Sequence, residues 1–239
     1  NYRYSGFDLD PNYFALQALI AFWCLFLYNK IENKYNYILL FILLIVGGAT
    51  ISKMYIITLI ISILIYVIFN MKSLLKISIG KIIGIVVFIT ILLMIMNKYI
   101  IPVFESRFDS VKDISDLTTG RSDIWRDYIN YISNNLKILF IGEGIGNGYL
   151  GGHATHSTYI LMIYRLGVLG SILLIGFITT IMKNIKIKIW SIYLIPLMVL
   201  MITNFALDIL DFDSFSYLLV LILGIYLIKQ KDSEVKNEN

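Results

Sequence analysis

Both histidines of this 239-residue chain, His153 and His156, lie in one short segment, "HATHSTYI". Two imidazoles three residues apart can bind a metal ion, accept a proton near neutral pH, or simply be neighbours. Zinc would need a third protein ligand, and although Glu143 or a loop aspartate could serve, nothing in the pattern specifies one. We therefore expect no metal and no other cofactor, while a histidine at a helix start can act as a proton acceptor near neutral pH.

Several basic residues stand next to, or inside, apolar segments. Lys53 separates two closely spaced apolar runs, Arg121 follows a Thr-Thr-Gly sequence, and Arg165 lies within an apolar run. A cluster of cations with a histidine is suited to an anionic, lipid-linked substrate such as a diphosphate. Each also has a simpler interpretation: Lys53 as a charged turn residue, Arg121 and Arg107 as solvated surface residues, and Arg165 as a snorkelling or paired arginine.

The elements that carry these residues are strongly apolar. Hydrophobic residues make up 58% of the chain and the mean hydropathy is +0.78, above the range of soluble domains. A bilayer core requires about 20 helical residues. The sequence predicts a single all-α, polytopic membrane domain over residues 1–239, with about seven transmembrane helices at 13–29, 36–51, 54–70, 79–100, 157–182, 189–207 and 214–228.

The distribution of lysine predicts the orientation of these helices. Alternate connecting segments and the tail at 229–239 contain eleven basic and four acidic residues, and short cytoplasmic loops are enriched in lysine and arginine. These segments are therefore predicted to be cytoplasmic. The basic residues concerned are Lys30, Lys34, Lys72, Lys76, Lys81, Lys183, Lys186, Lys188, Lys229, Lys231 and Lys236.

The segment 101–156 is then an extracytoplasmic loop, too long to be a simple connector. Its stretch 122–135 places Ile124, Tyr128 and Ile132 on one helical face, which predicts an amphipathic helix. Such a helix either lies on the membrane surface or packs as a lid on the helix bundle. The glycines of 142–152 match a dinucleotide-binding pattern without the strand that such a motif needs, so we expect a mobile loop or backbone N–H groups near an anion.

Four sequence patches, taken in order, carry a resemblance to a known family. They are "RYSGFDLDPNYFA" at 3–15, "ISKMYIITL" at 51–59, "TTGRSDIW" at 118–125 and "GEGIGNGY…HSTYILMIYRLGVLG" at 142–170. Together they resemble the O-antigen ligase and O-antigen polymerase (Wzy-type) membrane proteins of bacterial polysaccharide assembly. The departures are lysine in place of arginine at Lys53 and serine in place of asparagine at Ser157.

The resemblance implies a GT-C-like helical bundle with further spans before this chain. It implies glycosyl transfer from an undecaprenyl-diphosphate-linked glycan to an acceptor glycan, on the outer face of the bacterial cytoplasmic membrane, without metal or nucleotide. Lys53 and Arg121 would hold the diphosphate, and His156 would deprotonate or orient the acceptor hydroxyl. The substrate-binding positions would be Arg3, Asp10, Asn12, Arg107, Tyr159 and Arg165.

Three functions remain open at this stage. A composition rich in Ile, Lys, Asn and Tyr indicates an AT-rich genome, which favours a capsule or exopolysaccharide polymerase over a ligase that transfers the glycan to a lipid or protein. A flippase for polyprenyl-linked oligosaccharides would need charges along a path through the bundle, whereas here all except Arg165 are confined to one face. Expected partners are membrane lipids, a flippase and a chain-length regulator, and no nucleic acid.

Overall fold

The computed structural model describes residues 4–6, 10–28, 34–74, 120–146, 148–184, 192–209, 218–224 and 226–227, and every regular element in these ranges is a helix. The all-α prediction is thus confirmed for this part of the chain. Short 3-10 turns occur at η2 (Leu150–Gly152) and η3 (Ile192–Leu194). The α-helices are α1 (Pro11–Tyr28), α2 (Lys34–Ala49), α3 (Lys53–Leu74), α7 (Arg121–Ser133), α8 (Leu136–Ile141), α9 (Thr158–Asn184) and α10 (Ile195–Thr203).

Only part of the seven-span prediction is supported. Two stretches of helix, Lys53–Asn70 in α3 and Thr158–Lys183 in α9, are long and apolar enough to cross a membrane. The helices in the predicted spans 13–29, 36–51 and 189–207 are apolar but shorter, and residues 218–224 of the last span are helical. The predicted span 79–100, the loop before residue 120 and the tail at 229–239 lie outside the described residues.

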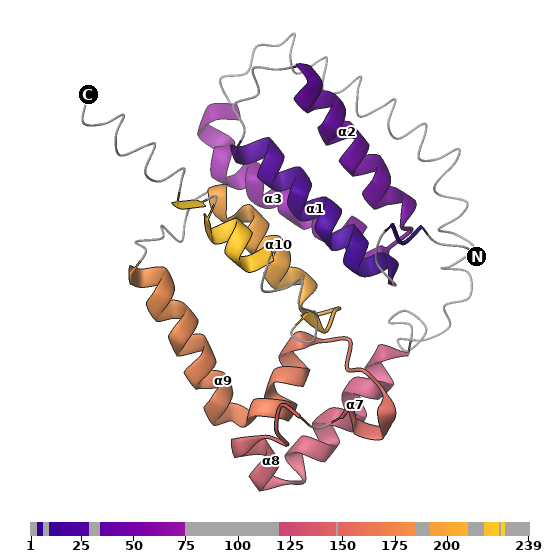
Figure 1. The fold of residues 1–239 in the computed structure, drawn as a ribbon, viewed down its shortest axis with the longest axis vertical. Coiled ribbons are helices and arrows are strands. Elements are labelled where there is room, and N and C mark those ends of the chain that lie inside the picture. Colours follow the sequence, from indigo (N-terminus) through magenta and orange to yellow (C-terminus); the bar gives the residue numbers. More distant parts are fainter. Residues whose placement is uncertain are drawn as a thin grey trace.

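The helices α1, α2, α3 and α10 pack together in one bundle, in which α3 lies behind α1, and α7, α8 and the first turns of α9 form a second group at one end of it (Figure 1). The larger hydrophobic core lies within this bundle, around Trp23, Leu200 and Ile222, each at most 2% exposed. The indole Nε1 of Trp23 donates to Ser62 Oγ over 2.9 Å, so the polar atom of this large side chain is satisfied inside the core.

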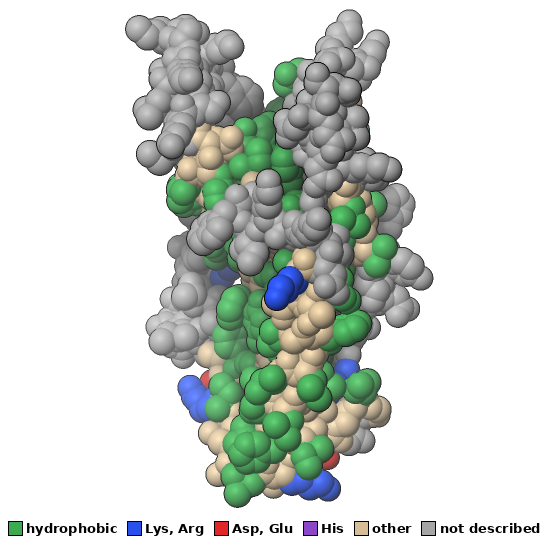
Figure 2. Space-filling model, turned by 90° about the vertical axis from the view of Figure 1, so that its left-hand side faces the viewer, with side chains coloured by type: hydrophobic (Ala, Val, Ile, Leu, Met, Phe, Trp, Pro, Cys, Tyr) green, Lys and Arg blue, Asp and Glu red, His purple; other side chains and the backbone are tan. Residues whose placement is uncertain are grey.

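The side of the molecule along α9 is largely apolar in the space-filling view (Figure 2). Leu169, Ile172, Leu173 and Phe177 of α9 are each more than half exposed. A continuous exposed apolar face of this kind on a long helix suits contact with lipid.

Local sequence explains why α1 and α3 start where they do. Asp10 caps α1, because its Oδ1 accepts hydrogen bonds from the backbone N and the Nδ2 of Asn12, at 2.7 and 2.9 Å, and Pro11 occupies the first helical position. Ser52, just before α3, donates from Oγ to Asn12 Oδ1 over 2.7 Å. The starts of α1 and α3 are therefore joined directly, and the predicted hairpin between the second and third spans is confirmed.

The amphipathic helix predicted at 122–135 is α7, and its apolar face is packed against protein. Tyr128 and Ile132 are buried in a second core with Leu161 and Tyr164 of α9. The rings of Tyr128 and Tyr164 meet edge to face, with centroids 5.0 Å apart. The sequence left two arrangements open for this helix, one on the membrane surface and one packed on the helix bundle as a lid. For the face that carries Tyr128 and Ile132, the structure supports the packed arrangement.

A kink in α9 at Gly167 is stabilised by the glycine segment that precedes α9. Gly167 has φ 64° and ψ −179°, so the carbonyls of the preceding turn lose their helical partners. The backbone N–H groups of Glu143 and Gly144 donate to the carbonyls of Tyr164 and Arg165, at 2.8 and 3.0 Å. The expectation of a mobile or anion-binding loop is therefore wrong for these two residues, whose N–H groups are used inside the fold.

The Gly167→Ala substitution is expected to destabilise the protein strongly. A Cβ at this position would lie 2.4 Å from the backbone carbon of Phe140, and φ is in the left-handed region. Left-handed strain and the backbone clash together should cost about 2 kcal/mol or more. Thermal unfolding of the detergent-solubilised protein measures this loss. Gly176→Ala, in the same helix with open space around the new Cβ, is the control and should change little; equal losses would contradict the role of the kink.

Candidate functional site

The turn that follows α10, residues 204–209, connects the start of α9 to the bundle of α1, α2, α3 and α10. The backbone N of Thr158 donates to the carbonyls of Asn204 and Leu207, at 2.9 and 3.0 Å. The Thr158 hydroxyl donates to the Leu207 carbonyl over 2.7 Å and accepts from the Ile209 N–H over 2.9 Å. These bonds satisfy donors at the N-terminus of α9 that have no partner inside the helix. They fix the segment that carries His156 against the end of α10.

Asp208 is the central residue of this turn. Its side chain is 2% exposed, and its carboxylate accepts hydrogen bonds from the Thr155 hydroxyl and from the backbone N–H groups of His156 and Ser157, the latter two both at 2.7 Å. A buried carboxylate is tolerated only when its oxygens are satisfied in this manner. Asp208 thereby determines the backbone conformation of residues 155–157.

His156 is held in an unusual conformation. Its φ is 50°, in the left-handed region that residues other than glycine rarely adopt, and the bond from its N–H to Asp208 keeps it there. The side chain is partly exposed, and within the described part of the chain the imidazole makes no hydrogen bond. Burial and then the positive charge of Arg121 lower the pKa of His156, while Asp208 and Asp10 oppose this shift. The imidazole is therefore neutral at pH 7 and able to accept a proton.

Arg121, the first residue of α7, reaches the same turn. Its guanidinium donates to the carbonyl of Ala206 over 2.9 Å, which uses one of the five N–H donors of an arginine. Burial lowers the pKa of Arg121, and the carboxylates of Asp10 and Asp208 act in the opposite direction. An arginine remains cationic under these conditions, so a positive charge with further donors lies beside the neutral imidazole.

The helix α7 holds the histidine loop at two points and the 204–209 turn at a third. Besides the bond from Arg121, the Trp125 indole donates to the Thr155 carbonyl over 2.8 Å, and the Tyr128 hydroxyl donates to the His153 carbonyl over 2.9 Å. Burial raises the pKa of Tyr128 to about 12, so this hydroxyl stays protonated and keeps donating. The T-G-R-x-x-x-W patch of the sequence thus has a physical meaning, since its Arg and Trp, one helical turn apart, bind the two segments that form the site.

Lys53 lies at the edge of the same region. It is the first residue of α3, partly buried, and adjacent to Ser52, whose bond to Asn12 links it to the cap residue Asp10. The charge of Asp10 acts on both Arg121 and His156. The charge of Asp10 thus connects Arg121 and His156, whereas Lys53 is placed near them through its neighbour Ser52 and the capped start of α1.

Backbone strain marks one of these positions, His156, and a residue close to another of them. In the described part of the chain, the non-glycine residues with positive φ are Ile51 and His156, both at 50°. Ile51 is β-branched, for which this conformation is a genuine outlier, and it stands two residues before Lys53. Strain of this kind is found where the surrounding structure holds a functional residue in place.

The remaining predicted positions have other surroundings. Asp10 and Asn12 lie at the site, where they cap α1 and join it to α3. Arg165 lies over the ring of Tyr149, 5.5 Å from its centroid, among the residues of α7 and α8. Tyr159 donates its hydroxyl to the Met201 carbonyl over 2.8 Å, and its ring packs at a tilt against that of Phe205, so it joins α9 to α10. Arg3 and Arg107 lie outside the described residues.

Asp208 is the functional residue that sequence reasoning missed. In the sequence it is one of three acidic residues in a short stretch, with Asp211 and Asp213, and it is 52 positions from His156. His153, in contrast, has an exposed side chain and contributes its carbonyl to Tyr128, as expected of a loop neighbour. Within the described ranges, no group of three or more His, Cys, Asp or Glu side chains is arranged to hold a metal ion.

The site thus combines a neutral histidine on a strained backbone, an arginine with unused donors, and a buried aspartate that fixes the loop. Comparison of the chain with models of protein families, with characterised proteins and with solved structures finds no match.

Proposed function

We propose that this chain is part of a metal-independent membrane glycosyltransferase that polymerises glycan repeat units from a polyprenyl-diphosphate donor. The observation that carries the proposal is the convergence of Arg121 and His156 on the 204–209 turn, an anion-binding group beside a proton acceptor. The sequence resemblance to O-antigen polymerases and ligases supports the same reaction.

The proposed location is the outer face of the bacterial cytoplasmic membrane, with α3 and α9 among the membrane-spanning helices. The starts of α1, α3 and α9 and the end of α10 meet at the site. The lysine distribution assigns these same helix ends to the outer side. The finer features, about seven spans and a GT-C-like bundle, belong to this proposal.

The proposed reaction needs two groups. His156 accepts the proton of an acceptor sugar hydroxyl, whose oxygen forms a bond to the anomeric carbon of the donor glycan. The bond from that carbon to the diphosphate oxygen breaks, and polyprenyl diphosphate leaves with the electron pair. Arg121 and Lys53 stabilise the negative charge that develops on the leaving diphosphate. Of the two, only the arginine offers paired, forked donors to phosphate oxygens.

A reconstitution experiment tests the proposal. The full-length protein in liposomes is supplied with undecaprenyl-diphosphate-linked repeat units from the host bacterium, and products are separated by size. A ladder of polymers is expected, and it should disappear in the Arg121→Ala protein. Transfer only to an added lipid or protein acceptor would identify a ligase, and movement across the bilayer without bond formation would identify a flippase; either result would overturn the polymerase.

Lys53→Arg is expected to retain most of the polymerising activity, whereas Lys53→Ala should lose it by roughly tenfold or more. The reason is that arginine keeps the charge and adds phosphate-binding geometry, while alanine removes a charge-assisted interaction. Rates of polymer formation at saturating donor measure both. Equal defects in the two variants would show that residue 53 acts through the fold of the α2–α3 hairpin.

A further inference from the structure

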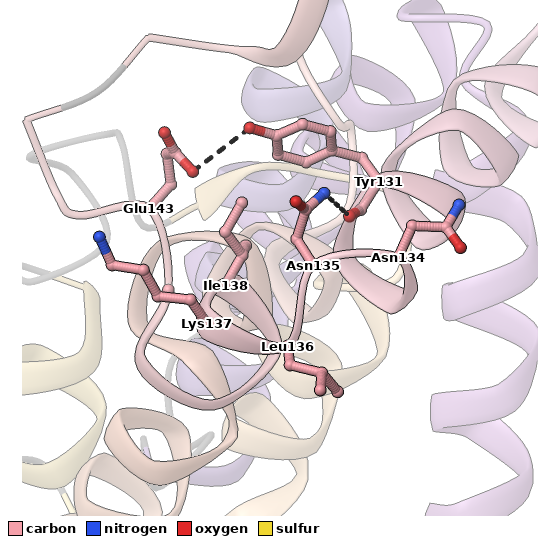
Figure 3. A pocket seen from close by; sticks show the side chains of 8 residues that line it. Tyr131, Asn134, Asn135, Leu136, Lys137, Ile138 and Glu143 are labelled. Carbon is pink, nitrogen blue, oxygen red and sulfur yellow. Dashed lines mark hydrogen bonds between the residues drawn. The ribbon is translucent and has the colours of Figure 1, made fainter.

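A polar pocket lies at the far end of α7, where that helix turns into α8. Its volume is about 550 Å³, and its polar lining consists of Tyr131, Asn134, Asn135, Lys137 and Glu143. Figure 3 shows these side chains around one opening, with Lys137 and Glu143 on one side of Asn135 and Asn134 on the other. None of these residues takes part in the site around His156.

The lining is suited to a ligand rich in hydroxyl groups. Two amides, a carboxylate, an ammonium group and a phenol provide both donors and acceptors. Tyr131 donates its hydroxyl to Glu143 Oε2 over 3.4 Å, and Asn135 donates its Nδ2 to the Tyr131 carbonyl over 2.7 Å, so the lining is partly fixed before a ligand binds. An apolar ligand would leave these groups unpaired, and the Glu143 carboxylate would repel a phosphate.

The pocket is connected to the catalytic region by one side of α7. Ile124, Asp127, Tyr131 and Asn134 follow a spacing of three and four residues, which places them along a single helical face. A smaller pocket of about 90 Å³, lined by Asp127 and His153 among others, lies on this face between the large pocket and Arg121. At 1.5 Å per residue, the distance from Arg121 to Asn134 is about 20 Å, which an oligosaccharide of several sugars can span.

We propose that this pocket binds the acceptor glycan several sugars away from its reacting end, and thereby holds the growing chain while His156 acts on its terminal hydroxyl. The inference rests on the proposed polymerase function and names the saccharide-binding surface of that enzyme. Binding energy gained at a remote site positions the reacting group, so short acceptors should react less well than long ones.

The test is a binding measurement that needs no turnover. Oligosaccharides of one, two and three repeat units, released from the surface polysaccharide of the host bacterium, are titrated calorimetrically into the full-length His156→Asn protein in nanodiscs. The three-unit oligosaccharide should bind most tightly. Combining Asn134→Ala with the isosteric Glu143→Gln should weaken its binding by roughly tenfold or more, because one amide is removed and the charged carboxylate acceptor is replaced by a neutral amide.

Asn130→Ala is the matched control, since Asn130 is an exposed asparagine of the same helix that does not line the pocket. Unchanged affinity in this control with loss in the pocket variant supports the inference. Unchanged affinity in the pocket variant, equal loss in the control, or no binding by the parent protein would overturn it. Failure of the proposed function gives a different result, in which the glycan binds at the pocket but the wild-type protein forms no polymer in liposomes.

Discussion

The His156→Asn protein is expected to fold and insert normally but to polymerise glycan at least a hundredfold more slowly than the wild type. Asparagine tolerates the left-handed backbone of position 156, so the contact of its N–H with Asp208 can persist. It cannot accept a proton near neutral pH, and loss of a general base typically costs about 10²- to 10⁴-fold in rate. The measurement is the initial rate of polymer formation in liposomes, together with protein level and thermal stability.

The pH dependence of the wild-type enzyme provides an independent check on the same residue. Burial and the charge of Arg121 lower the pKa of His156 below its ordinary value of 6.5. The neutral, active form therefore predominates above pH 6.5, and the rate should fall as the pH drops through the lowered pKa. Polymer formation by His156→Asn at the wild-type rate, or a wild-type rate that falls on going above pH 6.5 towards neutrality, would remove histidine from the mechanism.

The Asp208→Asn protein is expected to lose activity nearly as completely, although Asp208 need not touch the substrate. An amide in place of the carboxylate presents one oxygen where two are used, so at least one of the N–H groups of His156 and Ser157 loses its acceptor. Each charge-assisted bond is worth about 1.5–3 kcal/mol, and without them the strained conformation of His156 should relax. A fall in kcat with a smaller change in the KM for donor is the expected signature of a positioning residue.

Stability should fall in the same variant. Thermal unfolding measures this loss, and Asp123→Asn provides the control, because Asp123 is an exposed carboxylate of α7 that pairs with Arg126 at the surface. The control should change neither activity nor melting temperature appreciably. An Asp208→Asn protein with wild-type kcat would show that the left-handed backbone at position 156 is not required for the reaction.

Features that depend on neighbouring residues could be predicted from the sequence. The turn between the apolar runs that Lys53 separates and the amphipathic pattern of α7 are local signals of turn position and periodicity. The grouping of Arg121 with His156 followed from the predicted topology, which placed both on one face. Their contacts with the 204–209 turn could not be predicted in this way.

What could not be predicted depends on contacts between distant residues. Asp208 is buried against residues 155–157, and no pattern in one sequence reveals such a contact. The surroundings of Arg165 could not be predicted either: its charge within an apolar run indicates function by default, and the fold places it over Tyr149. The role of the glycines at 142–144 likewise depends on the kink at Gly167, some 25 residues away in the sequence.

The position of the 204–209 turn has a consequence for how this protein can be damaged. The last of the four sequence patches ends at residue 170. A chain cut by a premature stop codon just after α10 would therefore retain all four. It would nevertheless lack the Ala206 carbonyl that Arg121 binds and the Asp208 carboxylate that holds His156. Such a truncated gene would still look intact to any search based on motifs, while its product would have the catalytic groups without the means to bring them together.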